Sequence, residues 1–130
     1  MPKTIVQVSD THLCEVHPYF ADNWQIFAEE MASLQPDLLI HTGDISLNGT
    51  MDDRAMKHIK EAVDNLRIPC VAIPGNHDIG TTGGPLKPIS EARIAHWHAH
   101  FGDDRFIHDV EDWRLIGLNT EVFGSGLQSE

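Results

Sequence analysis

The stretch Thr4-Ile5-Val6-Gln7-Val8-Ser9-Asp10-Thr11-His12 decides the fold, because a strand-like run ends directly in a cluster of polar side chains. Residues 4–8 are largely apolar and β-branched, which predicts a buried strand. The same kind of unit occurs twice more: residues 37–41 precede Thr42-Gly43-Asp44, and residues 70–73 precede Gly75-Asn76-His77-Asp78. The chain is therefore expected to begin with three short strands, each followed by residues that can carry chemistry.

Two amphipathic segments separate these strands. The first has apolar residues at i, i+3, i+4 and i+7, which predicts a helix with Asp22 as its cap. These residues are Trp24, Phe27, Ala28 and Met31. The second predicted helix carries Ala55, Ile59, Ala62, Val63 and Leu66, with Thr50 or Asp52 near its start. Crossovers of this length make neighbouring strands parallel, so we expect a mostly parallel sheet flanked by helices.

The pattern changes after Gly80. Residues 81–88 form a Gly- and Pro-rich loop, and Ser90 is expected to cap a helix that ends at Gly102. The predicted core face of this helix consists of Ile94, Trp97, His98 and Phe101. Residues 106–110 and 113–118 predict an antiparallel hairpin. The expected fold class is α/β, a parallel sheet followed by a hairpin, in a single domain over residues 1–130.

The composition limits the partners of the chain. A formal net charge of −11 disfavours a nucleic-acid polymer, because such binding normally needs clustered Lys and Arg. The apolar runs are too short to span a bilayer and no charged leader precedes residue 4, so we expect a cytoplasmic protein without membrane contact. Cys14 and Cys70 are too few for a disulfide framework and are expected to be buried, reduced thiols.

The polar clusters are expected to meet in space. In an open parallel sheet, ligands bind just beyond the carboxyl ends of the strands. Five side chains should gather there: Asp10, His12, Asp44, Asn76 and His77. Carboxylates packed together repel one another, and no Lys or Arg lies within the clusters. A divalent cation is the natural counter-charge for such a site.

The donor types indicate which cations this site would hold. Carboxylate and amide oxygens together with an imidazole suit Mn, Fe or Zn. Asp10 and His12 are two residues apart, so on an extended segment they project to the same side and can grip one ion. Asp44 could bridge two ions, and Asn76 would give its amide oxygen to the second.

Two divalent ions would polarise a phosphoryl group and turn a bridging water into hydroxide. His77 is the predicted catalytic residue, because it follows Asn76 directly and can face the substrate rather than an ion. It would stabilise charge on the phosphoryl oxygens or protonate the leaving alkoxide. Asn76 is also expected to contact the substrate, and Asp78 is expected to orient the His77 ring from behind.

The three clusters resemble the motifs of a known family. Asp10-Thr11-His12, Gly43-Asp44 and Gly75-Asn76-His77-Asp78 are similar to the D-x-H, G-D and G-N-H-D/E blocks of calcineurin-like metallophosphoesterases. Residues 8–13 and 115–120 are most similar to the branch that hydrolyses cyclic nucleotides and glycerophosphodiesters. The resemblance implies an enzyme that cleaves a small phosphodiester, such as a 3',5'-cyclic nucleotide, with metal-bound hydroxide.

The resemblance also implies that the chain is an N-terminal portion of the domain. Members of the family add later histidines, including a G-H-x-H block, and a second sheet that completes a two-sheet sandwich. The chain ends before these parts would occur, so half of the sandwich is expected. An apolar face normally covered by the second sheet would then promote self-association into a homo-oligomer.

Two other functions are consistent with the same residues. A phosphomonoesterase or nucleotide pyrophosphohydrolase would use the same metals, whereas a non-catalytic metal-binding fragment or accessory module would not turn over substrate. His96, His98 and His100 are not expected to replace the later histidines of the family. His96 and His98 point in different directions on a helix, and His96 and His100 lie opposite its predicted core face.

Overall fold

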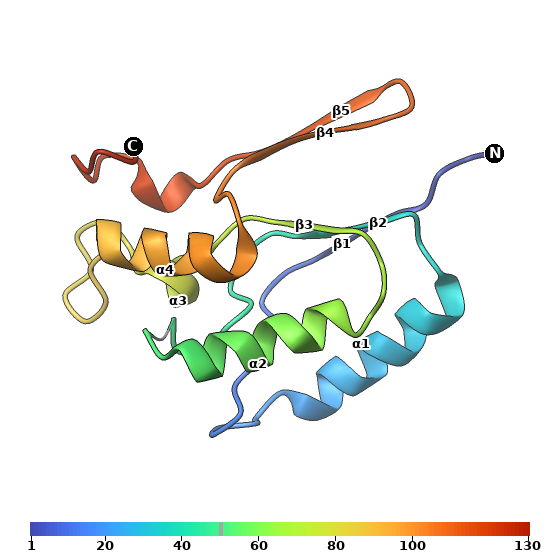
Figure 1. The fold of residues 1–130 in the computed structure, drawn as a ribbon, viewed down its shortest axis with the longest axis horizontal. Helices are drawn as coiled ribbons and strands as arrows, with labels where there is room; N and C mark the ends of the chain where they lie inside the picture. Colours follow the sequence, from blue (N-terminus) through green and yellow to red (C-terminus); the bar gives the residue numbers. More distant parts are fainter. Residues whose placement is uncertain (50) are drawn as a thin grey trace.

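The computed structural model describes residues 1–49 and 51–130 and shows an α/β fold (Figure 1). Its elements are β1 (Ile5–Val8), α1 (Ala21–Leu34), β2 (Leu38–His41), α2 (Asp53–Asp64), β3 (Cys70–Ala72), α3 (Asn76–Ile79), α4 (Glu91–Phe101), β4 (Phe106–Val110), β5 (Trp113–Gly117) and the 3-10 helix η1 (Thr120–Val122). The predicted fold class is confirmed. Among these residues, no helix combines the length and apolar character that crossing a membrane requires.

The first three strands form a parallel sheet in the order β1-β2-β3. The central strand β2 is deeply buried, and Leu38 and Leu39 are each 1% exposed. β1 lies at the sheet edge, where Ile5 is 36% exposed. The prediction that the first strand is buried is therefore wrong, because β1 pairs with a neighbour on one side only.

The helices pack around the sheet and the main core. α1 and α2 cover one side of the sheet, and the β4–β5 hairpin projects on the other (Figure 1). The core lies mainly between α2, α3 and α4. Its buried residues include Met56, Ile59, Val63, Ile79, Ile94 and Trp97. The predicted apolar spacing of α2 and α4 therefore gives the faces that bury this core.

The structure confirms two of the three predicted helix caps. Asp52 caps α2, because its side chain accepts hydrogen bonds from two backbone N–H groups of the first turn. Ser90 caps α4 by accepting one such bond. The alternative cap Thr50 lies outside the described residues. Asp22 does not cap α1, because that helix starts earlier and Phe20 occupies the cap position without a side-chain hydrogen bond.

Two side chains expected in the interior lie at the surface. His98 was predicted on the core face of α4, yet its side chain is 43% exposed. Successive residues turn about 100° around a helix, so a core face centred on Ile94 and Trp97 leaves His98 at its rim. Cys70 is exposed and Cys14 is half-buried, and both are free. The prediction of buried thiols is therefore wrong for Cys70.

The predicted hairpin is confirmed as a separate antiparallel unit with a two-residue turn. Ile107 pairs with Ile116 across it, and these residues are 68% and 62% exposed. Asp109 and Arg114 also pair across the two strands and form a bidentate ion pair, with N···O distances of 2.8 and 2.9 Å. The hairpin therefore presents apolar side chains to solvent beside a local ion pair.

Candidate metal centre

The segments that follow β1 and β2 run side by side beyond the sheet. The backbone N–H of Asp10 donates to the carbonyl of Gly43 at 3.0 Å, and the N–H of His12 donates to the carbonyl of Asp44 at 3.0 Å. Leu13 continues this contact through an isolated parallel bridge to Ser46. Main-chain hydrogen bonds therefore fix the polar residues of the first two clusters relative to each other.

The segment after β3 reaches the same place. The backbone N–H of His77 donates to Asp44 Oδ1 at 2.8 Å, and the rings of His12 and His77 meet edge to face at 4.7 Å. One ligand atom from each of His12, Asp44 and His77 lies within 4.8 Å of the others. Asp10 Oδ1 lies 3.6 Å from His12 Nε2. The structure thus gathers four of the five predicted side chains, which we call the strand-end cluster.

Asn76 is the fifth predicted residue and precedes His77 in the chain. It is exposed at the start of α3, and its carbonyl accepts a hydrogen bond from the N–H of Gly80 at 3.0 Å. Its amide as a metal ligand or substrate contact stays a prediction. The group of metal-ligand atoms found here among the described residues includes none of His96, His98 and His100.

Three residues of the strand-end cluster adopt a left-handed backbone conformation. The φ angle is +58° at Asp10, +46° at His12 and +53° at Asp44. Each such conformation costs on the order of 1–3 kcal/mol for a non-glycine residue and is concentrated at functional sites. The expectation that Asp10 and His12 lie on an extended segment is wrong. They approach each other through left-handed turns, held by their hydrogen bonds to the β2 segment.

Two glycines allow the second and third clusters to touch. A Cβ atom on Gly43 would lie 2.8 Å from the backbone nitrogen of Gly75, and one on Gly75 would lie 2.6 Å from the backbone nitrogen of Asp44. Gly43 also has a φ of +109°. A larger residue at either position would therefore push the β3 segment away from Asp44.

Asp78 holds the backbone around the cluster rather than the His77 ring. Its carboxylate accepts hydrogen bonds from the N–H groups of Gly75, Ile45 and Ser46 and from the Ser46 hydroxyl, at 2.8–3.3 Å. Burial raises the pKa of Asp78, and these donors oppose the rise. The expected contact between Asp78 and the His77 ring is replaced by this set of bonds.

The His77 ring is oriented by a residue that the sequence did not indicate. Its Nδ1 lies 2.5 Å from the carbonyl of Leu47. A carbonyl oxygen only accepts, so Nδ1 carries the proton in this arrangement. Leu47 contributes through its main chain, and no side-chain pattern could have revealed it. Nε2 is then the nitrogen left to act in the site.

His41, at the end of β2, supports the cluster from the interior. It is 1% exposed, and its Nε2 lies 2.9 Å from the Thr11 hydroxyl, while its Nδ1 accepts from the N–H of Gly43. Burial lowers the pKa of His41 to about 4, with an opposing contribution from Asp10. A neutral imidazole therefore supports the turn between Asp10 and His12 through Thr11.

The cluster fits a divalent cation. Asp44 offers a carboxylate oxygen and His12 an imidazole, and Asp10 Oδ1 lies 3.6 Å from His12 Nε2. The other ring nitrogen of His12, Nδ1, is buried without a hydrogen-bond partner among the described residues. A buried nitrogen without a hydrogen-bond partner and two carboxylates in one cluster are each unfavourable for the protein alone. A divalent cation would neutralise the carboxylates and would accept a lone pair from the His12 ring.

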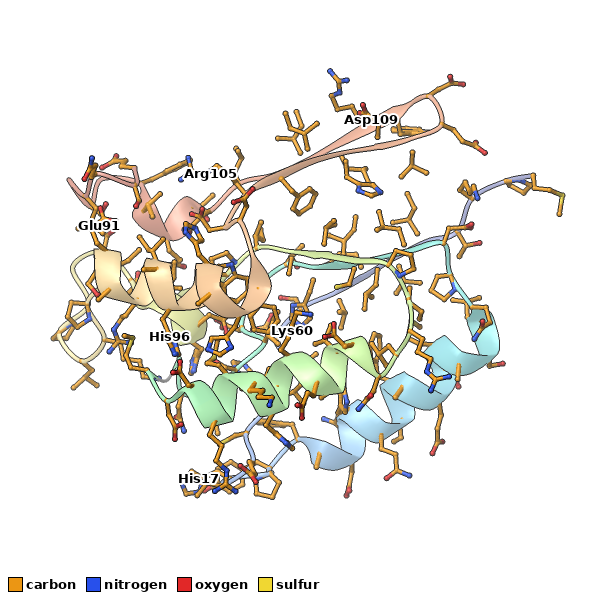
Figure 2. All side chains as sticks on the ribbon, viewed as in Figure 1. His17, Lys60, Glu91, His96, Arg105 and Asp109 are labelled. Carbon is orange, nitrogen blue, oxygen red and sulfur yellow. The ribbon has the colours of Figure 1, made fainter. Side chains whose placement is uncertain are left out.

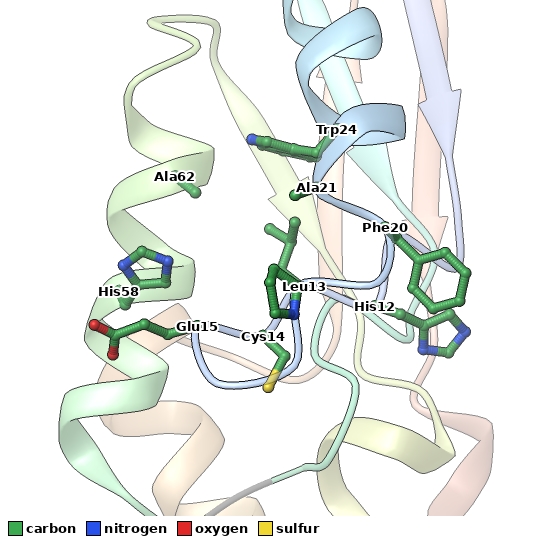
Figure 3. Close-up of a pocket in the computed structure, with 10 residues that line it drawn as sticks. His12, Leu13, Cys14, Glu15, Phe20, Ala21, Trp24, His58 and Ala62 are labelled. Atoms are coloured by element: carbon green, nitrogen blue, oxygen red, sulfur yellow. The ribbon is translucent and has the colours of Figure 1, made fainter.

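Two pockets flank the segment that carries Asp10 and His12. Figure 3 shows the first, of about 230 Å³, between α1 and α2, with His12 beside Phe20 at one edge and His58 at the other. The second, of about 240 Å³, runs along Ser9, Asp10 and Thr11. Sites that enclose a drug-sized ligand usually measure about 300–1,000 Å³, so these hollows suit small ligands.

The chain is an α/β protein with a parallel sheet and a group of metal-ligand side chains beyond the strand ends. Comparison with known families identifies the kind of protein that has this arrangement. Residues 3–126 match the model of the calcineurin-like phosphoesterase family, and the chain belongs to this family. Proteins of this family use a divalent metal centre, for which the strand-end cluster offers ligands. The resemblance expected from the three motifs is confirmed.

Several relatives are phosphodiesterases by name. The chain is 27% identical to the 3',5'-cyclic adenosine monophosphate phosphodiesterase CpdA of Escherichia coli K12, over 92% of this chain and 42% of that protein. It is 38% identical to a probable glycerophosphodiester phosphodiesterase GpdQ of Arcobacter nitrofigilis, over 97% and 48%. A probable cyclic nucleotide phosphodiesterase of Moraxella catarrhalis is 29% identical, over 92% and 45%. The chain therefore spans less than half the length of these relatives.

Proposed function

We propose that this chain supplies the metal centre of a phosphohydrolase that cleaves a small phosphodiester. The observation that carries the proposal is the gathering of His12, Asp44 and His77 within 4.8 Å, with Asp10 beside them. In this proposal Asp10, His12 and Asp44 hold one divalent cation, and Asp44 and Asn76 hold a second, of the Mn, Fe or Zn type. When bound, these ions supply the Lewis acidity that polarises the phosphoryl group and activates water.

His77 is the proposed catalytic residue. Its backbone N–H on Asp44 and its Nδ1 at the Leu47 carbonyl fix the ring at the cluster. With Nδ1 protonated, Nε2 donates a proton only from the imidazolium form of His77. That form can hydrogen-bond a phosphoryl oxygen or protonate the leaving alkoxide. Asn76, exposed next to it, is the proposed second contact to the substrate.

The proposed substrate is a small phosphodiester, with a 3',5'-cyclic nucleotide or a glycerophosphodiester as the leading classes. Three features support this choice: the names of the relatives, the small pockets beside Asp10 and His12, and the net charge of −11. An acidic surface repels a long polyanion, whereas bound cations attract a small one locally.

A second candidate rests on the length of the match. The chain covers 42–48% of its relatives, so it is also consistent with a module that binds metal and does not turn over substrate. A manganese-loaded chain assayed with a chromogenic aryl phosphodiester and with the matching monoester separates the candidates. Hydrolysis of the diester supports the proposal, and hydrolysis of the monoester alone supports a phosphomonoesterase.

The assay needs two variants to assign any activity to the strand-end cluster. Asp44→Asn removes a ligand charge with little change in shape and is expected to abolish turnover. Asp103→Asn makes the same chemical change at an exposed residue between α4 and β4 and is expected to leave turnover unchanged. Metal retained without turnover of either ester would identify the chain as the non-catalytic module.

A further inference from the structure

A second group of metal-ligand side chains lies between α2 and α4. His96 and His100, one turn apart on α4, both direct Nε2 at the same carboxylate oxygen of Asp53, at 2.9 and 3.1 Å. One ligand atom from each of the three lies within 4.8 Å of the others. Figure 2 shows His96 in the space between α4 and α2. Nothing in the proposed phosphodiesterase chemistry uses these residues.

We propose that Asp53, His96 and His100 form a second metal site, for zinc or a similar borderline cation such as cobalt. Zinc binds imidazole nitrogen and carboxylate oxygen at about 2.0–2.2 Å, so two ligand atoms at a tetrahedral angle are ~3.3 Å apart. The observed separations of 2.9 and 3.1 Å are within a few tenths of an ångström of that value. Two imidazoles favour zinc, cobalt or nickel over magnesium or calcium.

The two imidazoles are held in place before any ion arrives. Their side chains are 11% and 16% exposed, and their rings meet edge to face at 4.9 Å. These residues lie on the face of α4 opposite its predicted core face, and the start of α2 covers them there. Little side-chain entropy remains to be lost when a cation binds here.

The carboxylate leaves the site open to water on one side. The Asp53 side chain is 85% exposed, so solvent can provide a fourth ligand. Three protein ligands and one water form a common zinc coordination.

A cation in this site would join α4 to the chain that supports His77. Asp53 is the first residue of α2, and the loop before it carries the Leu47 carbonyl that faces the His77 ring. Arg93 of α4 also donates to the carbonyl of Gly49 in that loop, at 3.2 Å. An ion bound in the second site would cross-link α2 and α4, so we assign this site a structural role and no part in catalysis.

Zinc binding by the whole chain tests the proposal. Zinc stoichiometry and affinity would be measured by titration calorimetry on the wild-type chain and on Asp44→Asn, which weakens the strand-end cluster. The Asp44→Asn chain is expected to keep one zinc equivalent. Adding His96→Gln or His100→Gln to it should remove that equivalent or weaken it roughly 10- to 100-fold or more, since even supporting residues of metal sites contribute that much.

Controls separate metal binding from a hydrogen-bonded cluster and from loss of structure. His58→Gln, added to the same background, changes an exposed histidine on α2 and should leave the remaining zinc equivalent in place. Asp53→Asn keeps an oxygen that accepts from both imidazoles but loses the charge, and should weaken zinc binding while preserving the fold by circular dichroism. Zinc should raise the melting temperature of Asp44→Asn and should not raise it in the double variants.

Two results of the zinc titrations would contradict the second metal site. If Asp44→Asn alone removes all bound zinc, or if the His96 and His100 variants bind as much zinc as their parent, the site does not exist. The phosphodiester assay with manganese provides a separate readout. His100→Gln is expected to turn over diester like the wild-type chain, so failure of the proposed function and failure of the zinc site are distinguishable.

Discussion

Asp44 connects the chain segments that follow β1, β2 and β3. Its carbonyl accepts from His12, its Oδ1 accepts from the N–H of His77, and its backbone is left-handed. It also offers a ligand atom to the cluster. One residue therefore joins all three strand-end segments and carries a charge that a cation would neutralise.

The first prediction compares Asp44 with His77. Asp44→Asn is expected to weaken manganese binding about 10-fold or more, because a ligand charge is lost next to the remaining carboxylate of Asp10. His77→Ala is expected to keep most of the metal and to lose turnover, because Nε2 acts on the substrate. Metal content after dialysis, measured by atomic emission, checks this order. Equal metal loss in both variants would make His77 a ligand instead.

His41 determines a second prediction, on the pH dependence of stability. Its pKa falls from 6.5 to about 4 on folding, because burial disfavours the charged ring, with Asp10 raising and His12 lowering the value. Between these pH values the unfolded chain binds more protons than the folded chain. The stabilisation from neutral His41 is therefore complete above pH 6.5 and is lost as the pH falls towards 4.

The expected loss is up to about 3 kcal/mol for a shift of this size. Urea denaturation of the wild-type chain and of His41→Gln at several pH values between 4 and 7 would measure it. The raised pKa of Asp78 gives the opposite slope, and it cancels when the two chains are compared. Parallel curves for the two chains would show that His41 is not the titrating group.

At the scale of the elements, a buried carboxylate joins α4 to the end of the hairpin. Asp104 is 4% exposed and accepts a hydrogen bond from the Asn119 amide at 2.7 Å, and its other oxygen lies 2.9 Å from His98 Nε2. Burial raises the pKa of Asp104, but hydrogen bonds from Asn119 and His98, with the charge of Arg105, outweigh it and the pKa is lowered. The exposed His98 therefore has a structural partner.

This arrangement gives the third prediction. Asp104→Asn is expected to destabilise the chain by about 1–3 kcal/mol, because one buried donor loses its acceptor. Asp103→Asn changes the exposed neighbour and serves as the matched control, with little expected effect. The free energy of unfolding in urea measures both. A destabilisation as small as that of the control would assign no stabilising role to the Asp104 bonds.

The elements themselves follow from the sequence, whereas the details of the site do not. Apolar periodicity predicts the helices with Met31, Ile59 and Trp97 on their buried faces, and the strand ends predict where the ligands gather. Both signals are local. The left-handed turns at Asp10 and Asp44 depend on hydrogen bonds between segments that are distant in the chain, so no local pattern indicates them.

Contacts between elements explain one incorrect prediction, for Asp78, and two features that residue spacing did not indicate. His96 and His100 are covered because α2 starts beside α4, and Asp78 turns to the backbone of the β2 segment instead of the His77 ring. The Leu47 carbonyl enters the site through its main chain, which every residue type possesses. Packing of this kind is set by the fold as a whole and is not encoded in the spacing of one segment.

At the scale of the whole molecule, apolar side chains remain exposed on the hairpin. Ile107 and Ile116 lie opposite each other and are 68% and 62% exposed, and Trp113 near the turn is 73% exposed. Exposed apolar side chains gathered on one element are typical of surfaces that bind protein. The hairpin is therefore the surface through which we expect the chain to self-associate.

The fourth prediction is that the chain forms oligomers through the hairpin. Its weight-average sedimentation coefficient should rise with concentration, and Ile116→Lys should weaken the association about 10-fold or more, because a charge would be buried in an apolar contact. Ile26→Lys is the matched control, since Ile26 is 61% exposed on α1, away from the hairpin. A wild-type chain that sediments as one monomeric species at every concentration would contradict the prediction. Equal weakening by both variants would place the contact elsewhere on the surface.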